Sequence, residues 1–71
     1  MVKNRLKEIR MREYMMEPKE FAEYLSVNTK TYYSWEREAA GPTLEKALEV
    51  AKKLNKQIEQ IWYLDLSLIH I

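Results

Sequence analysis

The chain has 71 residues, no cysteine and a formal net charge of +1, and this length indicates a single small domain. Without cysteine it can form neither disulfides nor thiolate metal sites, and His70 is its only histidine. We therefore expect no metal, no cofactor and no enzyme activity. The apolar runs are far shorter than the ~20 residues of a membrane helix, and charged residues follow Met1-Val2 directly, unlike in a signal peptide. These features predict a soluble, cytoplasmic protein with no membrane contact.

Basic charge is concentrated near the N-terminus. Residues 1–12 contain five basic residues and one acid, a net of +4, whereas residues 38–71 contain four lysines and five acids, a net of −1. The basic end could face a polyanion such as nucleic acid. A solvated helix face would explain the same charges, so charge alone does not decide between the two interpretations.

With one glycine and two prolines, the chain reads as an all-α protein, a compact bundle of five short helices. The first predicted helix covers residues 3–15, because strong helix formers dominate and Leu6 and Ile9 recur at helical spacing. Both side chains would face the core.

The second predicted helix runs from residue 18 to about residue 25. Pro18 suits the first helical position, where its missing N–H would be unpaired anyway. Glu20 can reach back toward the start of the helix, as in a capping box. The apolar face of this helix would consist of Phe21, Ala22 and Leu25.

The third and fourth predicted helices each begin at a good cap. Asn28 would cap a helix over residues 29–37, which would bury Tyr32 and Trp35 because residues three apart share a face. Thr43 would cap a helix over residues 44–54. Its apolar stripe at helical spacing would comprise Leu44, Ala47, Leu48, Ala51 and Leu54.

A fifth helix is predicted over residues 57–64, where it would bury Ile58, Ile61 and Trp62. Residues 66–71 then form an apolar, alternating tail after a domain of residues 1–65. This tail could pack on a symmetric partner, fold back on its own domain, or be an irregular end. Apolar side chains are costly to leave in water, so we favour a homodimer contact through the fifth helix and the tail.

The second and third helices form a distinctive pair. The three-residue break Ser26-Val27-Asn28 joins them, and the small residue Ala22 stands where two helices would cross closely. Apolar residues recur on both sides of the break, which is the pattern of a helix-turn-helix unit. Ala22 and Ser26 would shape the turn.

Two segments, FAEYLSVNTKTYYSWERE and GPTLEKALEVAKKLNKQIEQIW, resemble the lambda-repressor-like, Cro-type helix-turn-helix family, also called the xenobiotic-response-element family. The first is similar to the family's Leu-Ala-x-x-Leu-Gly-Val-Ser turn with its recognition helix and Glu. The second is similar to its Pro-Ser-Leu start of the fourth helix and its final short helix. The resemblance covers residues 3–64 and implies a DNA-binding transcriptional regulator.

The sequence departs from the family pattern at four places. Ser26 and Glu38 stand where the family usually has Gly, and Pro18 replaces a Gln that often touches a phosphate. The stretch between the first and second helices is one residue longer than the commonest spacing. The family's buried Arg–Glu pair would correspond to Arg10 and Glu36, with Met11 as the competing occupant of the Arg position.

In a DNA reader of this geometry, the third helix lies in the major groove with its N-terminal residues at the base edges. The side chains opposite the buried face predict base readout by Asn28, Thr29, Lys30, Tyr33 and Ser34. Phosphate contacts are expected from flanking groups: Lys3, Arg5, Lys19, Arg37 and Thr43. Taken alone, residues 29–33 are more typical of an ordinary amphipathic helix than of a DNA-reading helix, and only the family resemblance favours the DNA-reading interpretation.

The leading interpretation is a bacterial or phage-type repressor that binds a palindromic operator in double-stranded DNA as a dimer, with control by its own concentration or by a separate regulatory protein partner. The alternative is a protein-interaction module on the same fold, antitoxin-like or an accessory factor, because the net charge is weak and fold does not fix function. Pro18 and Glu38 also favour this alternative.

Overall fold

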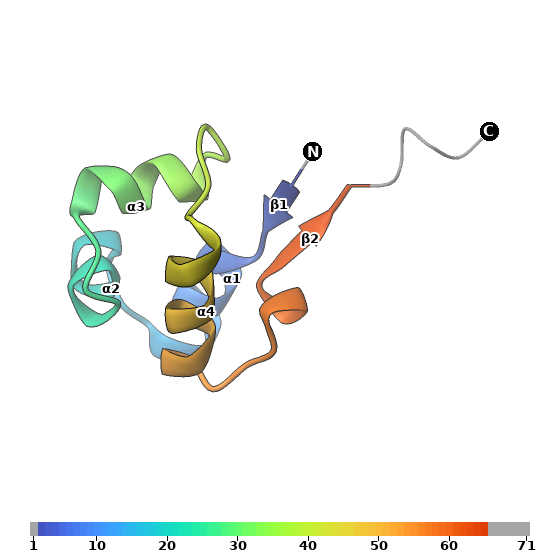
Figure 1. Ribbon diagram of the computed structural model, residues 1–71. Helices are drawn as coiled ribbons and strands as arrows, with labels where there is room; N and C mark the ends of the chain where they lie inside the picture. The colour runs from blue at the N-terminus through green and yellow to red at the C-terminus, as the bar shows by residue number, and fades with distance from the viewer. Residues whose placement is uncertain (1, 66–71) are drawn as a thin grey trace.

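The computed structural model describes residues 2–65; the predicted tail, residues 66–71, lies outside the described residues. The elements follow in the order β1 (Val2–Asn4), α1 (Leu6–Ile9), the π-helical turn η1 (Arg10–Tyr14), α2 (Pro18–Tyr24), α3 (Thr29–Glu36), α4 (Leu44–Lys53), the 3₁₀ turn η2 (Ile58–Gln60) and β2 (Trp62–Leu64). Figure 1 shows the helices gathered together, with β1 and β2 side by side at one edge. In the described part of the chain, no helix combines the length and apolar character needed to cross a membrane.

The chain is mostly helical but not all-α, because residues 2–4 and 62–64 form a small sheet. β1 and β2 pair antiparallel, with Val2 opposite Leu64 and Asn4 opposite Trp62. The predicted fifth helix over residues 57–64 is therefore wrong: a single 3₁₀ turn, η2, is followed by the strand β2. Aromatic residues favour strands when a partner strand is available, and β1 supplies that partner; its residues 3 and 4 lie within the predicted first helix.

The first helix begins at Leu6, three residues later than predicted. The side-chain oxygen of Asn4 accepts a hydrogen bond from the Leu6 N–H at 3.1 Å, which satisfies one of the unpaired donors at the helix start. Arg5 N–H donates to the Ile61 carbonyl at 2.8 Å and so extends the bonding between the β1 and β2 segments. Pairing with β2 thus determines where helical structure begins.

The core is built from every helix and from η2–β2. The residues that are buried as predicted are Leu6, Ile9, Phe21, Ala22, Leu25, Tyr32, Trp35, Ala47, Ala51, Leu54 and Ile61. Ile58 and Trp62, also predicted to be buried, are only partly buried. The prediction for the fourth helix was partly wrong, because Leu44 and Leu48 are 71% and 53% exposed and Val50 is buried instead. Two overlapping apolar stripes exist on this helix, and helical spacing alone does not choose between them.

The turn between α2 and α3 is closed by a left-handed residue, Ser26, with φ 59°. Its N–H donates to the Glu23 carbonyl at 3.0 Å, and Val27 N–H donates to the Ala22 carbonyl at 2.8 Å, the two bonds of a Schellman motif. Lys46 on α4 also donates from Nζ to the Ser26 carbonyl at 3.2 Å. A side chain in this conformation is strained, which is why Gly is the usual residue at such a position.

Ser26→Gly is expected to stabilise the protein by about 0.5–1 kcal/mol, because it relieves the left-handed strain without removing the backbone hydrogen bonds. The measurement is a shift of the urea midpoint with an unchanged slope. The matched control is Glu23→Gly, at an exposed position inside α2, which should lose about 0.5–1 kcal/mol. A midpoint for Ser26→Gly at or below that of the wild type would contradict the strain argument.

Candidate nucleic-acid interface

Helix α3 is anchored by one face and open on the other. It begins at Asn28, whose side-chain oxygen accepts a hydrogen bond from Lys30 N–H at 2.9 Å, so the predicted N-cap is confirmed. Tyr32 and Trp35 are 0% and 3% exposed, and Tyr32 packs edge-on against Phe21 of α2 with ring centroids 5.7 Å apart. This packing leaves the opposite face of α3 free to meet a partner.

The outward face of α3 carries positive charge and hydrogen-bonding groups. Lys30, Tyr33 and Arg37 follow one another at helical spacing and are all exposed, so they share one stripe. Arg37 Nε donates to the Tyr33 carbonyl at 3.4 Å, which brings its guanidinium beside this stripe. Thr29 and Ser34 are half-buried at its margins. The only acid within α3 is Glu36, and its carboxylate points to the inside.

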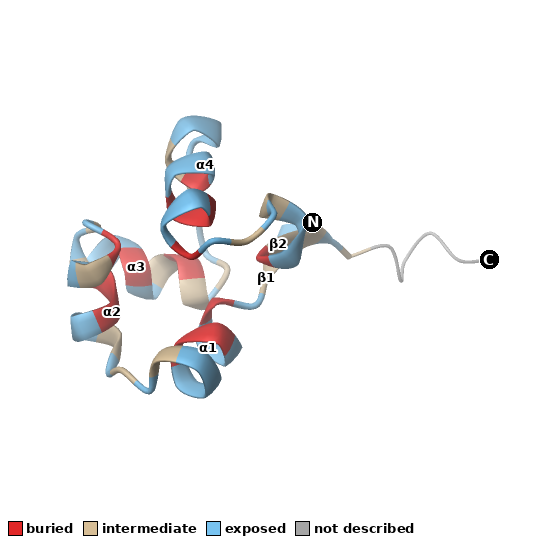
Figure 2. Cartoon of the chain, turned by 90° about the horizontal axis from the view of Figure 1, so that it is seen from below, coloured by how far each residue is buried: buried red, intermediate tan, exposed pale blue. Residues whose placement is uncertain are grey.

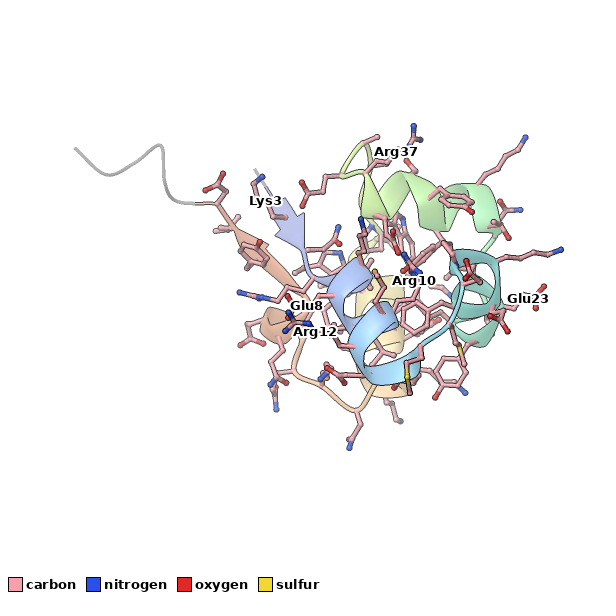
Figure 3. All side chains as sticks on the ribbon, turned by 180° about the vertical axis from the view of Figure 1, so that it is seen from behind. Lys3, Glu8, Arg10, Arg12, Glu23 and Arg37 are labelled. Atoms are coloured by element: carbon pink, nitrogen blue, oxygen red, sulfur yellow. The ribbon has the colours of Figure 1, made fainter. Side chains whose placement is uncertain are left out.

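That inward carboxylate is the centre of a network that holds α3 from behind. Arg10 on η1 donates from Nε to Glu36 Oε2 at 2.8 Å and from Nη2 to Glu36 Oε1 at 3.4 Å. The Tyr32 hydroxyl donates to the same carboxylate, and Arg10 Nη1 donates to the Met16 carbonyl at 2.9 Å. The Arg10 and Glu36 side chains are only 10% and 12% exposed. Figure 3 shows Arg10 directed inward and Arg37 directed outward at the far end of α3.

The network also changes the acid–base properties of its members. The hydrogen bond to Glu36 raises the pKa of the Arg10 guanidinium. Burial, followed by the hydrogen bond to Glu36, raises the pKa of the Tyr32 hydroxyl well above its ordinary value. Both groups therefore keep their protons at physiological pH and remain donors to Glu36.

The predicted pair of Arg10 with Glu36 is thus confirmed, and Met11 is 54% exposed instead of filling the slot. The extra residue before α2 is accommodated in η1, where the N–H of Met15 bonds to the carbonyl of Arg10 in a wide π turn. A π turn adds one residue without breaking the helix. Arg10 therefore stays aligned with Glu36 although the connection is longer.

A second anchor ties β1 to the C-terminal end of α3, and sequence reasoning missed it. Asn4 donates from Nδ2 to the Trp35 carbonyl at 2.7 Å, and its N–H donates to Glu38 Oε2 at 3.0 Å. Glu38 lies in the left-handed region, with φ 61°, as its place at a usual Gly position implies. The sequence offered one signal of this anchor, which is Glu38, a charged residue just after a helix where the family usually has Gly.

The structure distributes the predicted phosphate-contact residues over several elements. Lys3 lies 3.7 Å from Glu38 in an ion pair, and Arg5 lies over the Tyr63 ring at 4.1 Å from its centroid. Lys19 is exposed in the first turn of α2. The Thr43 hydroxyl accepts a hydrogen bond from Lys46 N–H at 3.2 Å and so caps α4. Arg37, in contrast, belongs to the outward stripe of α3 described above.

The two residues predicted to shape the turn, Ala22 and Ser26, lie within α2 and just after its C-terminal end. Ala22 is completely buried, and Ser26 has the left-handed backbone described above. Lys46, which reaches from α4 to the Ser26 carbonyl, was not predicted, because nothing in its local sequence distinguishes it from a solvated lysine.

Comparison with known families is consistent with this geometry. A family model described as helix-turn-helix matches residues 6–61, which is more than three quarters of the chain. The match includes α1 to η2 and stops short of the two strands. A search of curated proteins found no match.

Proposed function

We propose, from the premise that the chain belongs to the lambda-repressor/Cro-type helix-turn-helix family, that this DNA-binding transcriptional regulator is a repressor. It would occupy a palindromic operator as a dimer, with α3 of each copy in the major groove. The observation that carries the proposal is the outward stripe of α3, cationic and polar, on a helix whose other face is fixed by the core and by the Arg10–Glu36 network.

The chemistry of the stripe suits the edges of base pairs. Lys30 can donate to guanine O6 and N7, and the methyl group of Thr29 can meet thymine. The oxygen of Asn28 is engaged in capping α3, so Asn28 would read bases through its amide nitrogen. Tyr33, 45% exposed, can stack or donate a hydrogen bond, and Ser34 can donate or accept one.

Phosphate contacts would come from the surrounding residues. Arg37, Arg5 and Lys19 are exposed, and Thr43 lies at the start of α4. Lys3 would have to leave Glu38, which costs little because both side chains are partly solvated, at 36% and 26% exposed. Phosphate contacts position the protein on the duplex but do not themselves select a sequence.

Repression is the simplest outcome of such binding. Occupying a promoter excludes other proteins from the same groove, whereas activation needs an additional contact surface toward the transcription machinery. A two-fold dimer would place its two α3 helices about 34 Å apart, one turn of DNA. The operator would then be a palindrome with half-sites at that spacing.

The test is selection of bound sequences from a random duplex library, followed by two lysine variants. Lys30→Ala should cost about 1–3 kcal/mol and relax the sequence preference at one position of each half-site. Lys19→Ala, the matched control, should weaken binding to all sequences equally and reduce the salt slope by about 2, because each copy of the dimer loses one phosphate contact. Failure to enrich a palindrome would refute the operator proposal, and a uniform loss for Lys30→Ala would move Lys30 to the phosphate set.

Two observations favour the second candidate function, a protein-interaction module that is antitoxin-like or an accessory factor. Lys3 is already paired within the chain, which weakens one expected phosphate contact. Leu44 and Leu48 are exposed on α4, and an exposed apolar face is typical of a protein-binding surface. The salt dependence described in the Discussion separates the two functions.

A further inference from the structure

Helix α4 has two apolar side chains that nothing in residues 2–65 covers. Leu44 and Leu48, one helical turn apart, are 71% and 53% exposed. They line an open hollow together with Glu45, Glu49 and Lys52. Figure 2 shows α4 buried on one side and exposed on the other. Leaving two leucines in water is unfavourable, so this face, the α4 face, is a place where a partner would gain binding energy.

The charges beside the two leucines point to one kind of partner. Glu45 and Lys52 lie on the same flank of the leucines, because they are seven residues apart. In the described part of the chain, neither is in an ion pair. The acid is near the start of α4 and the base is near its end, so the flank changes sign along the helix.

A second α4 running antiparallel matches this pattern. In an antiparallel helix pair, residues on the same flank face each other in opposite order, so Glu45 of one copy meets Lys52 of the other, and the reverse pair forms by symmetry. Leu48 of each copy then lies near the centre of the pair, with Leu44 beside it. The helix dipoles are also antiparallel, which favours the arrangement.

We propose that the α4 face is the surface through which two copies of this chain form a two-fold dimer, with Leu44 and Leu48 at its centre and reciprocal Glu45–Lys52 ion pairs at its margin. The inference rests on the dimer in the proposed function and identifies its interface. It differs from the contact expected from sequence, which used the fifth helix and the tail.

Sedimentation equilibrium of the full chain without DNA tests the interface. The wild type is expected to be dimeric at ~50 μM, above the Kd of a micromolar dimer. Leu48→Glu should raise the dimer dissociation constant about a hundredfold or more, because each dimer contains the change twice. The matched control is Leu64→Glu on β2, where the leucine is similarly exposed, at 62%; it should leave the dimer unchanged. Circular dichroism confirms that both variants are folded.

The ion pairs are tested by reversal of charge. Glu45→Lys and Lys52→Glu should each raise the dissociation constant about tenfold, and the double variant should return it close to the wild-type value. Recovery in the double variant requires that these two residues meet across the interface. No recovery would contradict the antiparallel arrangement.

Three results would overturn the proposal: a monomeric wild type, a dimer lost in Leu64→Glu but kept in Leu48→Glu, or a dimer lost on deletion of residues 66–71. The last two would identify the β1–β2 ribbon or the tail as the true contact. The proposed function is judged separately, by binding of the Leu48→Glu monomer to a single half-site. Half-site binding by the Leu48→Glu monomer would support DNA binding independently of the interface. A wild type that is itself monomeric but binds a half-site would refute the interface and the dimer, but not DNA binding. A dimer that binds no DNA would refute only the function.

Discussion

Glu36→Ala is expected to unfold most of the protein at room temperature. The substitution removes the acceptor of both Arg10 and Tyr32 and leaves a guanidinium buried without its partner. Breaking a buried pair in this way costs about 3–5 kcal/mol, which is comparable to the total stability of a domain this small. The measurement is urea unfolding followed by circular dichroism, in comparison with the wild type.

Two variants show whether the loss comes from the network. Glu23→Ala removes an exposed carboxylate from α2, visible at the surface in Figure 3, and should change stability by less than about 0.5 kcal/mol. Combining Arg10→Met with Glu36→Gln removes the charge from both sides and keeps an acceptor for Tyr32, so it should recover much of the stability. If Glu36→Ala unfolds at the wild-type midpoint, the network does not hold α3.

Binding to random-sequence duplex DNA is expected to weaken steeply as salt increases. The proposed dimer presents four cationic contacts per copy, Lys3, Arg5, Lys19 and Arg37, so about eight phosphates lose their counterions. The plot of log affinity against log salt should have a slope of about −7, a loss of somewhat more than about 10⁴-fold between ~50 and ~200 mM salt. If Lys3 stays paired with Glu38, six contacts remain and the slope is about −5. Fluorescence anisotropy at several salt concentrations measures it.

Glu38→Gln distinguishes these two slopes. It keeps an oxygen that can accept from Asn4 N–H but removes the charge that holds Lys3. The slope should then become steeper by up to about 2 if Lys3 is paired in the wild-type complex, and stay constant if Lys3 already contacts phosphate. Absence of binding even at low salt would favour the protein-interaction module over the repressor.

The helix-turn-helix unit could be predicted because its signals are local. Pro18, Asn28 and Thr43 lie at the starts of their helices, and the spacing of Tyr32 and Trp35 identifies the buried face of α3. These features depend on residues within one or two turns of each other. The Arg10–Glu36 pair could be inferred only through the family resemblance, since no local rule connects two residues on different elements.

The features of the fold that could not be predicted from the sequence depend on contacts between distant segments. Nothing near Trp62 in sequence indicates that residues 2–4 will pair with it, and without that partner the segment resembles a helix. The orientation of α4 could not be predicted for the same reason. Both of its apolar stripes have helical spacing, and only packing against the rest of the protein buries the stripe containing Val50 instead of the one containing Leu44. The ion pair between Lys3 and Glu38 also needs the chain to be folded before it can be recognised.

The ribbon of β1 and β2 has a consequence for how quickly the domain forms and how slowly it opens. Contacts among α1, α2 and α3 join segments close in sequence, whereas the ribbon joins Val2 to Leu64. Closing such a long loop costs chain entropy early and is compensated only once the helices are assembled. We therefore expect the strands to pair after the rate-limiting step. The ribbon would then lengthen the lifetime of the folded state without accelerating folding.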